Sequence, residues 1–450
     1  MSIALLLLFL LVATLLFHFL SPWYLTPLAS NWGLIDTTID ITLIVTGIVF
    51  VAVNLFMAYC VLKFRHKPGL KAEYDPENTK LEVWLTVVTS VGVVAMLAPG
   101  LVVWGQFVTV PDDATDVEGV GQQWHWSYRL PGEDGQLGNV DIRHITERNP
   151  FGLDPEDPTG QDDVLVANPV LHLPVDRPVR MLLRSKDVLH NFTVPQFRVK
   201  MDLVPGMVTY EWFTPTVVGQ YDVLCEELCG IAHFAMRGRV VVDTQEDYDE
   251  WLAEQPTFAD TMARPAGDAT AGRAAYAICA ACHGQNGEGN QALNAPKIAG
   301  QEGWYLRRQI QYFKNGVRGT TEGDIFGATM APIMAAVPDD TAIDNIVAYI
   351  ETLPSEPATQ TVTGDPANGE RLYRSCAACH GYAGEGIWAL NAPGLAGMSD
   401  WYLARQLQYF QDEIRGAHPQ DAYGHQMLML ADVLPDEQAI NDMIAYINTL

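Results

Sequence analysis

Three apolar runs within the first 103 residues constrain the fold of this chain more than any other feature. We expect them to form membrane helices at about 3–20, 41–62 and 83–103, because a helix needs about 20 mostly apolar residues to cross a bilayer. Residues 1–106 are then the membrane region. By the positive-inside rule, the loop between the last two runs lies in the cytoplasm. Its basic residues are Lys63, Arg65, Lys67 and Lys71.

A cleaved signal peptide is the alternative for the first run. The run has no positively charged start and no clean small-residue cleavage site, so we expect a third, uncleaved helix with its N-terminus inside. The whole chain, at 450 residues, is too long for one compact domain. Its net charge of −27 argues against nucleic acid and anionic lipid as partners. That charge suits either a basic protein partner or a surface that is acidic for solubility alone.

The part of the chain beyond the membrane region divides into three folded units. Short alternating strands from about 107 to 243 indicate an all-β sandwich or barrel, and a short helix at 246–255 closes this domain, which spans 107–255. Segments 267–354 and 364–450 repeat each other with a constant offset of 97 residues, as in 391 − 294 = 97. Their helical periodicity predicts two similar, small all-α domains. The expected linkers are 256–266 and 355–363.

Each repeat contains the sequence CAACH, which has the spacing of a c-type haem attachment site. Two thiols one helical turn apart can each bind a haem vinyl group, and the histidine that follows can bind the iron. A redox disulfide of the thioredoxin kind is the alternative, but it needs no histidine and its βαβ context is absent. The residues are Cys279, Cys282 and His283 in the first repeat and Cys376, Cys379 and His380 in the second.

The repeat also predicts the sixth ligand of each iron. Met330 and Met427 are related by the offset of 97, and each lies 51 residues after the first haem cysteine (330 − 279 and 427 − 376). Met334 and Met429 have no methionine at the corresponding position, while His425 remains a competitor in the second repeat. A histidine–methionine pair suits electron transfer. The ordinary alternative is that these methionines only fill the core.

A third pair of cysteines lies in the stretch VLCEELCGIAHFAM, at 223–236. Two thiolates can bridge two copper ions, and the same stretch supplies an imidazole and a thioether. A second histidine, His190 in KDVLHNFTVP, follows an apolar run. A disulfide and a zinc site are the alternatives, but neither explains the methionine, because zinc gains little from a thioether. The four residues of the stretch are Cys225, Cys229, His233 and Met236.

These motifs resemble two known families. Residues 267–450 resemble tandem class I cytochromes c in CAACH, in the NAP turn and in the WYL/RRQIQYF helix. VLCEELCGIAHFAM, KDVLHNFTVPQFRVKMDLVPG and QQWHWSYRL resemble subunit II of cytochrome c oxidase, and that resemblance runs from about 39 to 243. It implies a cupredoxin fold with a dinuclear copper centre, CuA. The expected fold class is a multidomain membrane protein with N-terminal transmembrane helices, an all-β cupredoxin domain and two all-α cytochrome c domains.

The resemblance to subunit II also implies a set of copper ligands. One ion would be bound by His190 and Met236, and the other by His233 and the backbone carbonyl of Glu227. The two cysteines of the stretch would bridge the ions. The Glu227 side chain also matches a residue that reaches a magnesium ion at the border with subunit I.

Two further residues match functional positions of the same family. Trp124, in QWHW, matches the aromatic residue at which electrons arrive, whereas a purely structural core aromatic describes Trp126 better. Glu82, in KLEVWLT, resembles the acidic residue at the mouth of a proton channel. Here the following Trp stands one residue earlier than in the usual pattern, and a favourable contact with the helix dipole is the alternative. The chain also departs from the family by carrying two cytochrome domains, where the better-known fused oxidases carry one.

The expected function is that of subunit II of a cytochrome c oxidase in a bacterial inner membrane, with the copper and haem domains on the periplasmic side. Electrons from two c-type haems would pass through CuA to subunit I, which reduces oxygen to water and translocates protons. The catalytic oxygen site is not in this chain. The expected partners are subunit I, other oxidase subunits, and a cytochrome c or cytochrome bc complex as donor. We expect the haem at Cys279 to lie nearer the copper, because only a short linker separates its domain from the copper domain.

Two other functions fit the same residues. One is the electron-input subunit of a CuA-containing nitric oxide reductase. The other is a membrane-anchored electron carrier or copper-delivery protein, for which the paired cysteines and the position of Glu227 are not needed.

Overall fold

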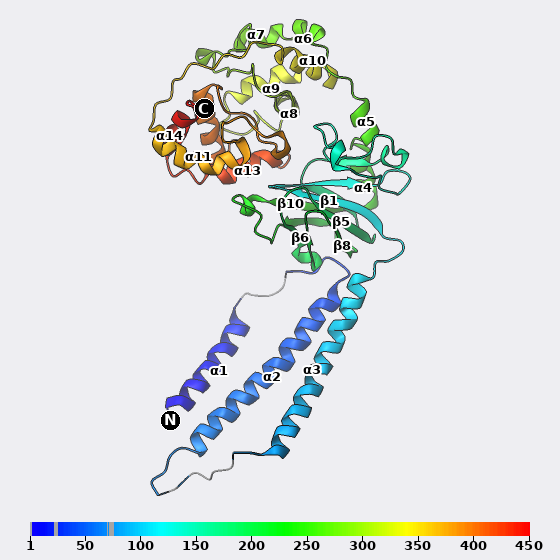
Figure 1. Ribbon diagram of the computed structural model, residues 1–450, viewed down its shortest axis with the longest axis vertical. Coiled ribbons are helices and arrows are strands. Elements are labelled where there is room, and N and C mark those ends of the chain that lie inside the picture. The colour runs from blue at the N-terminus through cyan, green and yellow to red at the C-terminus, as the bar shows by residue number, and fades with distance from the viewer. Residues whose placement is uncertain (1, 22–25, 70, 72–75) are drawn as a thin grey trace.

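Long apolar helices extend from one end of the folded part of the molecule (Figure 1). The computed structural model describes residues 2–21, 26–69, 71 and 76–450. Helices α1 (Ser2–Leu20), α2 (Gly33–Lys63) and α3 (Thr79–Val108) are each long and apolar enough to cross a membrane, as predicted. The start of α1, the end of α2 and the start of α3 lie at the end of the helices that is farthest from the folded domains (Figure 1).

The base of the β domain is joined to the start of α2. Trp32 donates a hydrogen bond of 2.9 Å from Nε1 to the carbonyl of Trp212, and the two rings pack edge to face. Arg198 forms a two-pronged ion pair with Asp36, at 2.6 and 2.9 Å. Apolar and charged contacts together therefore connect the membrane helices to the domain above them.

The β domain consists of two five-stranded sheets packed face to face, as the alternating sequence predicts. One sheet has the order β3-β2-β1-β5-β8 and the other β4-β10-β9-β6-β7. Trp126, Met181, Phe192 and Phe197 are fully buried in the core of this domain. The strands are β1 (Thr115–Gln122), β2 (His125–Leu130), β3 (Val164–Val166), β4 (Val170–Pro174), β5 (Val179–Ser185), β6 (His190–Val194), β7 (Val199–Leu203), β8 (Val208–Phe213), β9 (Gly219–Leu224) and β10 (Arg237–Asp243).

The segment 256–266, expected to be a polar linker, instead contains a packed helix. Helix α5 (Phe258–Ala263) starts with a capping box in which Thr257 and Asp260 bond to each other's backbone N–H groups. Phe258 is fully buried in a small apolar cluster that includes Phe151. One aromatic residue in a polar segment was therefore enough to attach it to the β domain. Before it lies α4 (Gln245–Ala253), close to the predicted closing helix.

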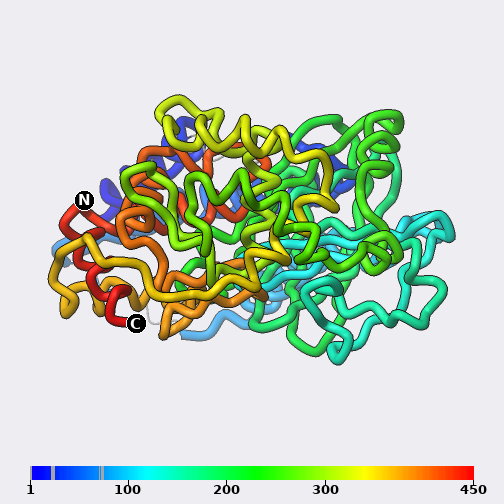
Figure 2. The backbone as a smooth tube through the Cα atoms, turned by 90° about the horizontal axis from the view of Figure 1, so that it is seen from above, coloured from blue at the N-terminus to red at the C-terminus, as the bar shows by residue number. Residues whose placement is uncertain are grey.

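Two helical domains follow, and they repeat each other helix by helix. In the first domain α6 packs on α10, and in the second α11 packs on α14. The helices of the first domain are α6 (Ala269–Ala275), α7 (Ala277–His283), α8 (Gly303–Lys314), α9 (Gly327–Ala335) and α10 (Asp340–Ile350). Those of the second are α11 (Pro366–His380), α12 (Asp400–Gln411), α13 (Ala422–Ala431) and α14 (Glu437–Ile447). Seen from above, the two cytochrome domains lie side by side (Figure 2).

A glycine allows the first and last helices of each domain to cross closely. A Cβ atom at Gly272 would lie 1.8 Å from the carbonyl oxygen of Asn345, and one at Gly369 would lie 2.0 Å from that of Asp442. Any side chain would therefore force the helices apart.

The second cytochrome domain, and not the first, lies on the end of the β domain that carries the cysteine loop. Figure 1 shows α13 beside the β domain, whereas α6 and α7 lie at the far end of the molecule. Gln426 Nε2 donates a hydrogen bond of 2.6 Å to the carbonyl of Trp124, and the hydroxyl of Tyr423 donates one of 2.8 Å to that of Ala167. The expectation that the haem at Cys279 lies nearer the copper is therefore wrong. Helices α4 and α5 lead the chain past the β domain before the first cytochrome domain begins.

Candidate functional site

The loop between β9 and β10 brings sulfur and nitrogen atoms together. The Sγ atoms of Cys225 and Cys229 are 3.7 Å apart, and no disulfide joins them. Cys229 Sγ lies 3.4 Å from Nδ1 of His233 and 3.8 Å from Sδ of Met236. At the start of β6, His190 places its Nδ1 4.0 Å from Cys225 Sγ. The ligand atoms of His190, Cys225 and Cys229 all lie within 4.8 Å of one another, so a metal could be bound between them.

The same loop directs a backbone oxygen at this cluster. The Sγ atom of Cys225 lies 3.3 Å from the carbonyl oxygen of Glu227. The cluster therefore offers two thiols, two imidazoles, a thioether and a carbonyl. Soft sulfur ligands combined with imidazole suit copper, and a thioether distinguishes the set from a structural zinc site. The residues present fit a dinuclear copper centre.

Asp187 orients His190, although the sequence pattern did not reveal it. Nε2 of the fully buried His190 lies 2.8 Å from Oδ1 of Asp187. Burial opposes protonation of His190, but hydrogen bonds with Asp187 and Cys225 outweigh it and raise the pKa of this histidine. With Nε2 bonded to the carboxylate, Nδ1 is the atom that faces the cysteine cluster. In the sequence, Asp187 is an acidic residue three positions before the histidine in KDVLH, a spacing too common to indicate this role.

The hydrogen bond between the two sulfur atoms of the loop lowers the pKa of Cys225 and raises the pKa of Cys229. Because thiolates and not thiols bind metals, loading of the site would displace protons from the pair.

Trp124 lies between the cysteine loop and the second cytochrome domain. Its Nε1 donates a hydrogen bond of 3.1 Å to the carbonyl of Cys229, and its own carbonyl accepts the bond from Gln426. Only 5% of Trp124 is exposed. Trp126, in contrast, is a core residue that packs edge to face on Phe192, with 5.5 Å between ring centroids.

Each cytochrome domain contains an apolar cavity beside its CAACH sequence, and the two cavities are continuous. Nδ1 of His283 lies 2.7 Å from the carbonyl oxygen of Pro296, and Nδ1 of His380 lies 2.7 Å from that of Pro393. Burial lowers the pKa of both histidines, so the neutral imidazole prevails. Each donates Nδ1–H to proline and keeps Nε2 free for an iron ion. The prolines belong to the NAP turn, whose repetition was visible in the sequence but whose role was not.

The candidate methionine ligands differ in position. Met330, Met334 and Met427 line the joined cavity, as do Cys279, Cys282, His283, Cys376 and His380. Met429 instead packs against the core of the β domain together with Cys379. Of the two methionines of α13, Met427 is therefore the one beside the haem cavity.

Replacing Met427 by alanine tests this distinction. We expect Met427→Ala to remove the sulfur-to-iron charge-transfer absorption of one haem and to lower its reduction potential, since loss of a thioether ligand destabilises ferrous iron. Met330→Ala should do the same for the other haem. The matched control is Met429→Ala, which should leave both haem spectra unchanged. A spectrum altered only by Met429→Ala would contradict the assignment, and redox-titrated absorption spectra decide between these outcomes.

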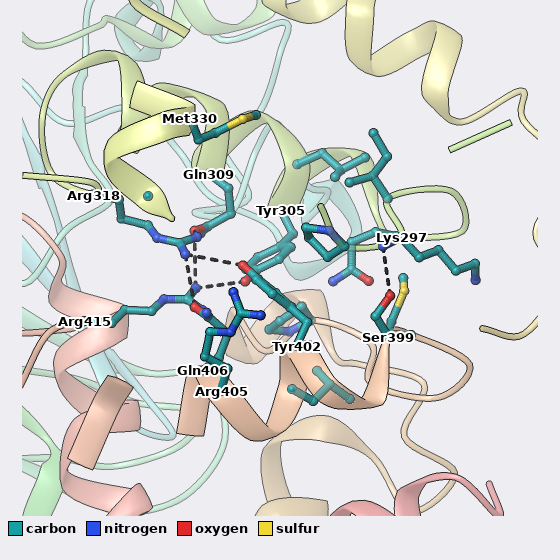
Figure 3. Close-up of a pocket in the computed structure, with 18 of the residues that line it drawn as sticks. Lys297, Tyr305, Gln309, Arg318, Met330, Ser399, Tyr402, Arg405, Gln406 and Arg415 are labelled. Carbon is teal, nitrogen blue, oxygen red and sulfur yellow. Dashed lines mark hydrogen bonds between the residues drawn. The ribbon is translucent and has the colours of Figure 1, made fainter. Parts of the chain in front are cut away.

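The interface between the cytochrome domains has approximate two-fold symmetry (Figure 3). Arg318 bonds to Gln406 at 3.1 Å, and its repeat partner Arg415 bonds to Gln309 at 3.2 Å. The symmetry is visible in the offset, since 318 + 97 = 415 and 309 + 97 = 406. Both guanidinium groups line the haem cavity, and in the part of the chain that the structure describes the buried Nε–H of each has no partner. Two guanidinium groups whose Nε–H groups need hydrogen-bond acceptors fit a cofactor that carries carboxylates.

Glu82 lies apart from these sites. It stands in the first turn of α3, whose helix is capped by the side chain of Asn78.

A β-sandwich with a sulfur-rich set of candidate metal ligands, preceded by helices apolar enough to cross a membrane and followed by two helical domains with CAACH sequences, is typical of membrane-bound electron-transfer proteins. Residues 115–244 match the family described as cytochrome c oxidase subunit II, periplasmic domain, and 269–354 and 366–450 match cytochrome c. The alternative cytochrome c oxidase subunit 2 of Bradyrhizobium diazoefficiens is 60% identical over 266 residues, which are 59% of this chain and 96% of that protein. This chain belongs to the cytochrome c oxidase subunit II family, and is thus a component of a haem-copper oxidoreductase.

Other relatives match parts of the chain. Cytochrome c oxidase subunit 2 of Cereibacter sphaeroides is 30% identical over 237 residues, 51% of this chain and 77% of that protein. Among solved structures, reduced recombinant cytochrome c4 from Pseudomonas stutzeri is 29% identical and covers 41% of this chain and 100% of its own, with a TM-score of 0.33. The periplasmic domain of subunit II of the oxidase of Bradyrhizobium japonicum is 26% identical, covers 32% and 95%, and has a TM-score of 0.24.

Proposed function

We propose that this chain is subunit II of a cytochrome c oxidase that reduces oxygen to water and translocates protons. Electrons arrive at the cytochrome domains and leave through the copper loop to subunit I, which carries the oxygen site. The observation that carries this proposal is the cluster around Cys225 and Cys229, onto whose loop a cytochrome domain is already packed. The chain would cross a bacterial inner membrane several times, with its β and cytochrome domains in the periplasm.

The residues that would hold the cofactors follow from the two sites. When bound, a copper pair supplies a one-electron centre whose geometry changes little on reduction. The proposed copper ligands are His190, Cys225, Glu227 (through its carbonyl), Cys229, His233 and Met236. Haem c would be attached at Cys279, Cys282, Cys376 and Cys379, with His283, Met330, His380 and Met427 at the irons. Arg318 and Arg415 are positioned to receive haem carboxylates.

The exposed side of the cysteine loop supports contact with a catalytic subunit. Leu228 is 83% exposed, Ile231 53% and Phe234 50%, an unusual amount of apolar surface for one short loop. Glu227 lies next to Leu228 and would reach a magnesium ion at that border. We propose that subunit I covers this surface.

Two further roles complete the proposal. Trp124, bonded to the carbonyl of Cys229, is the residue through which electrons would reach the copper loop. Glu82, at the start of α3, would stand at the cytoplasmic mouth of a proton channel. A cytochrome c or cytochrome bc complex would be the donor.

Purification of the full chain from its native membranes tests the function. We expect a haem-copper catalytic subunit to co-purify and the complex to consume oxygen with an electron donor. Glu82→Gln should lower proton translocation more than oxygen uptake, while Glu77→Gln, just before the start of α3, serves as the control. A complex that reduces nitric oxide but not oxygen would favour the nitric oxide reductase. A chain that purifies alone with exchangeable copper would favour the carrier or delivery protein.

A further inference from the structure

The second cytochrome domain contacts the β domain through one of its faces. The internal repeat identifies the corresponding face of the first cytochrome domain. In the second domain, contacts with the β domain are made by Ala378, Cys379, Ala389, Tyr423, Gln426, Met429 and Leu430. Subtracting the offset of 97 gives their counterparts in the first domain, which are Ala281, Cys282, Ala292, Phe326, Thr329, Pro332 and Ile333. Ala281, Ala292, Thr329 and Pro332 are exposed, and the other three are half-buried. The face that is covered in the second domain is therefore largely open in the first.

Two large apolar side chains border this open surface. Ile278 is 52% exposed and Leu293 is 54% exposed, and both line the mouth of the haem cavity, as Thr329 does. Their counterparts in the second domain are Ser375 and Leu390, of which the first is polar and both are half-buried. We call Ile278, Ala281, Ala292, Leu293, Thr329 and Pro332 the open face. It is uncharged in a chain of net charge −27, and exposed apolar surface of this kind marks an interaction site.

The second cytochrome domain blocks the other place at which an external donor could reach the cysteine loop, namely Trp124. Trp124 is 5% exposed and bonded to Gln426, and the ring of Tyr423 stacks edge to face on that of His125, at 5.5 Å between centroids. A soluble protein cannot approach the cysteine loop through Trp124 while this domain is in place.

We propose that the open face receives the external electron donor, a small soluble one-electron carrier whose cofactor edge is framed by apolar side chains and surrounded by basic residues. The apolar centre matches the open face, and the basic surround matches the strong negative charge of the chain, which would steer the encounter. Each encounter transfers one electron from the reduced carrier, which leaves oxidised, and no bond forms or breaks. The proposal rests on the proposed function and adds to it the place at which electrons enter.

Hydroxyl-radical footprinting of the full chain, with haem and copper loaded, tests the site directly. The probe is a purified, basic, reduced cytochrome c. We expect Ile278 and Leu293 to be labelled in the free chain and protected when the probe is added. Trp124 should be labelled weakly in both states. Protection confined to Trp124 or to the cysteine loop would overturn the proposal, and so would the absence of saturable binding.

Charge substitutions supply the second measurement. The double variant Ile278→Lys with Leu293→Lys should weaken binding of the probe by at least about tenfold, measured by calorimetry, because basic side chains replace apolar contacts and repel a basic partner. The matched control is Val433→Lys, also 50% exposed but in the second domain, which should change the affinity little. Equal weakening by all these substitutions would overturn the proposal. Binding of the probe does not require oxygen reduction. A chain without oxidase activity can therefore still bind the probe at the open face, and a chain with oxidase activity can fail to bind it there.

Discussion

Replacement of either Cys225 or Cys229 by serine should abolish the paired-copper signal of this protein. A serine hydroxyl is a hard, protonated ligand at neutral pH and cannot replace a bridging thiolate. In the intact chain, electron paramagnetic resonance should show hyperfine splitting from two equivalent copper nuclei. In Cys225→Ser or Cys229→Ser, we expect a single-copper pattern or no copper at all, together with a fall in bound copper measured by elemental analysis.

Cys60→Ser is the matched control, because Cys60 lies in α2, away from the cysteine loop. It should leave the copper signal and the copper content unchanged. If the intact chain instead contained Cys225 and Cys229 joined as a disulfide, with no copper signal, the copper assignment would be wrong. The haem domains would still stand in that case, and the protein would be a membrane-anchored dihaem cytochrome.

Replacement of Arg129 by methionine should destabilise the β domain by about 3–5 kcal/mol, the cost of breaking a buried ion pair by removing one partner. Arg129 is 3% exposed, and it bonds to Glu118 at 2.9 Å and to Asp163 at 2.5 Å. Glu118 keeps a second partner in Arg184, at 3.0 Å, but Asp163 has no other ion-pair partner among the described residues. Hydrogen-exchange mass spectrometry of peptides from β1, β2 and β3 reports this loss of unfolding free energy inside the full chain.

The destabilisation should also depend on pH. Burial raises the pKa of Asp163 to about 6, against the opposing effect of Arg129. A carboxyl group with a raised pKa binds a proton more tightly in the folded state, so its contribution to stability falls as pH rises from its ordinary value towards 6. Without Arg129 the pKa of Asp163 rises further. The pH range over which its contribution to stability falls then extends to higher pH. The cost of Arg129→Met should therefore be smaller at pH 5 than at pH 8.

Arg143→Met is the control for this prediction, because Arg143 also pairs with an aspartate of the β domain but is 82% exposed. Its removal should leave hydrogen exchange in the strands unchanged, since exposed ion pairs contribute little. Equal effects of Arg143→Met and Arg129→Met would show that the buried network does not stabilise the domain.

The sequence predicted the membrane helices, the β domain and the repeated cytochrome domains because each depends on local periodicity. It also predicted the residues that the cysteine loop gathers, because five of the six proposed ligands lie in one short stretch and His190 follows an apolar run. The roles of Asp187, Pro296 and Pro393 could not be predicted, because an aspartate or a carbonyl has no distinctive spacing of its own. The arrangement of the domains was predicted wrongly, because proximity in sequence does not determine which domain docks where. Docking depends on the surface side chains that meet, such as Gln426 and Tyr423, and sequence periodicity carries no information about these contacts.

The docking of α13 on the β domain has a consequence for kinetics. A donor that is part of the same chain has an effective concentration fixed by geometry, in the millimolar range or above for short connections, however dilute the protein is. In the proposed route, delivery of electrons to the cysteine loop would be a first-order process that salt does not screen. The encounter proposed at the first cytochrome domain would be second-order and sensitive to ionic strength. Dependence on diffusion would then be confined to that one surface, because the second cytochrome domain is held on the β domain by contacts such as that of Gln426 with Trp124.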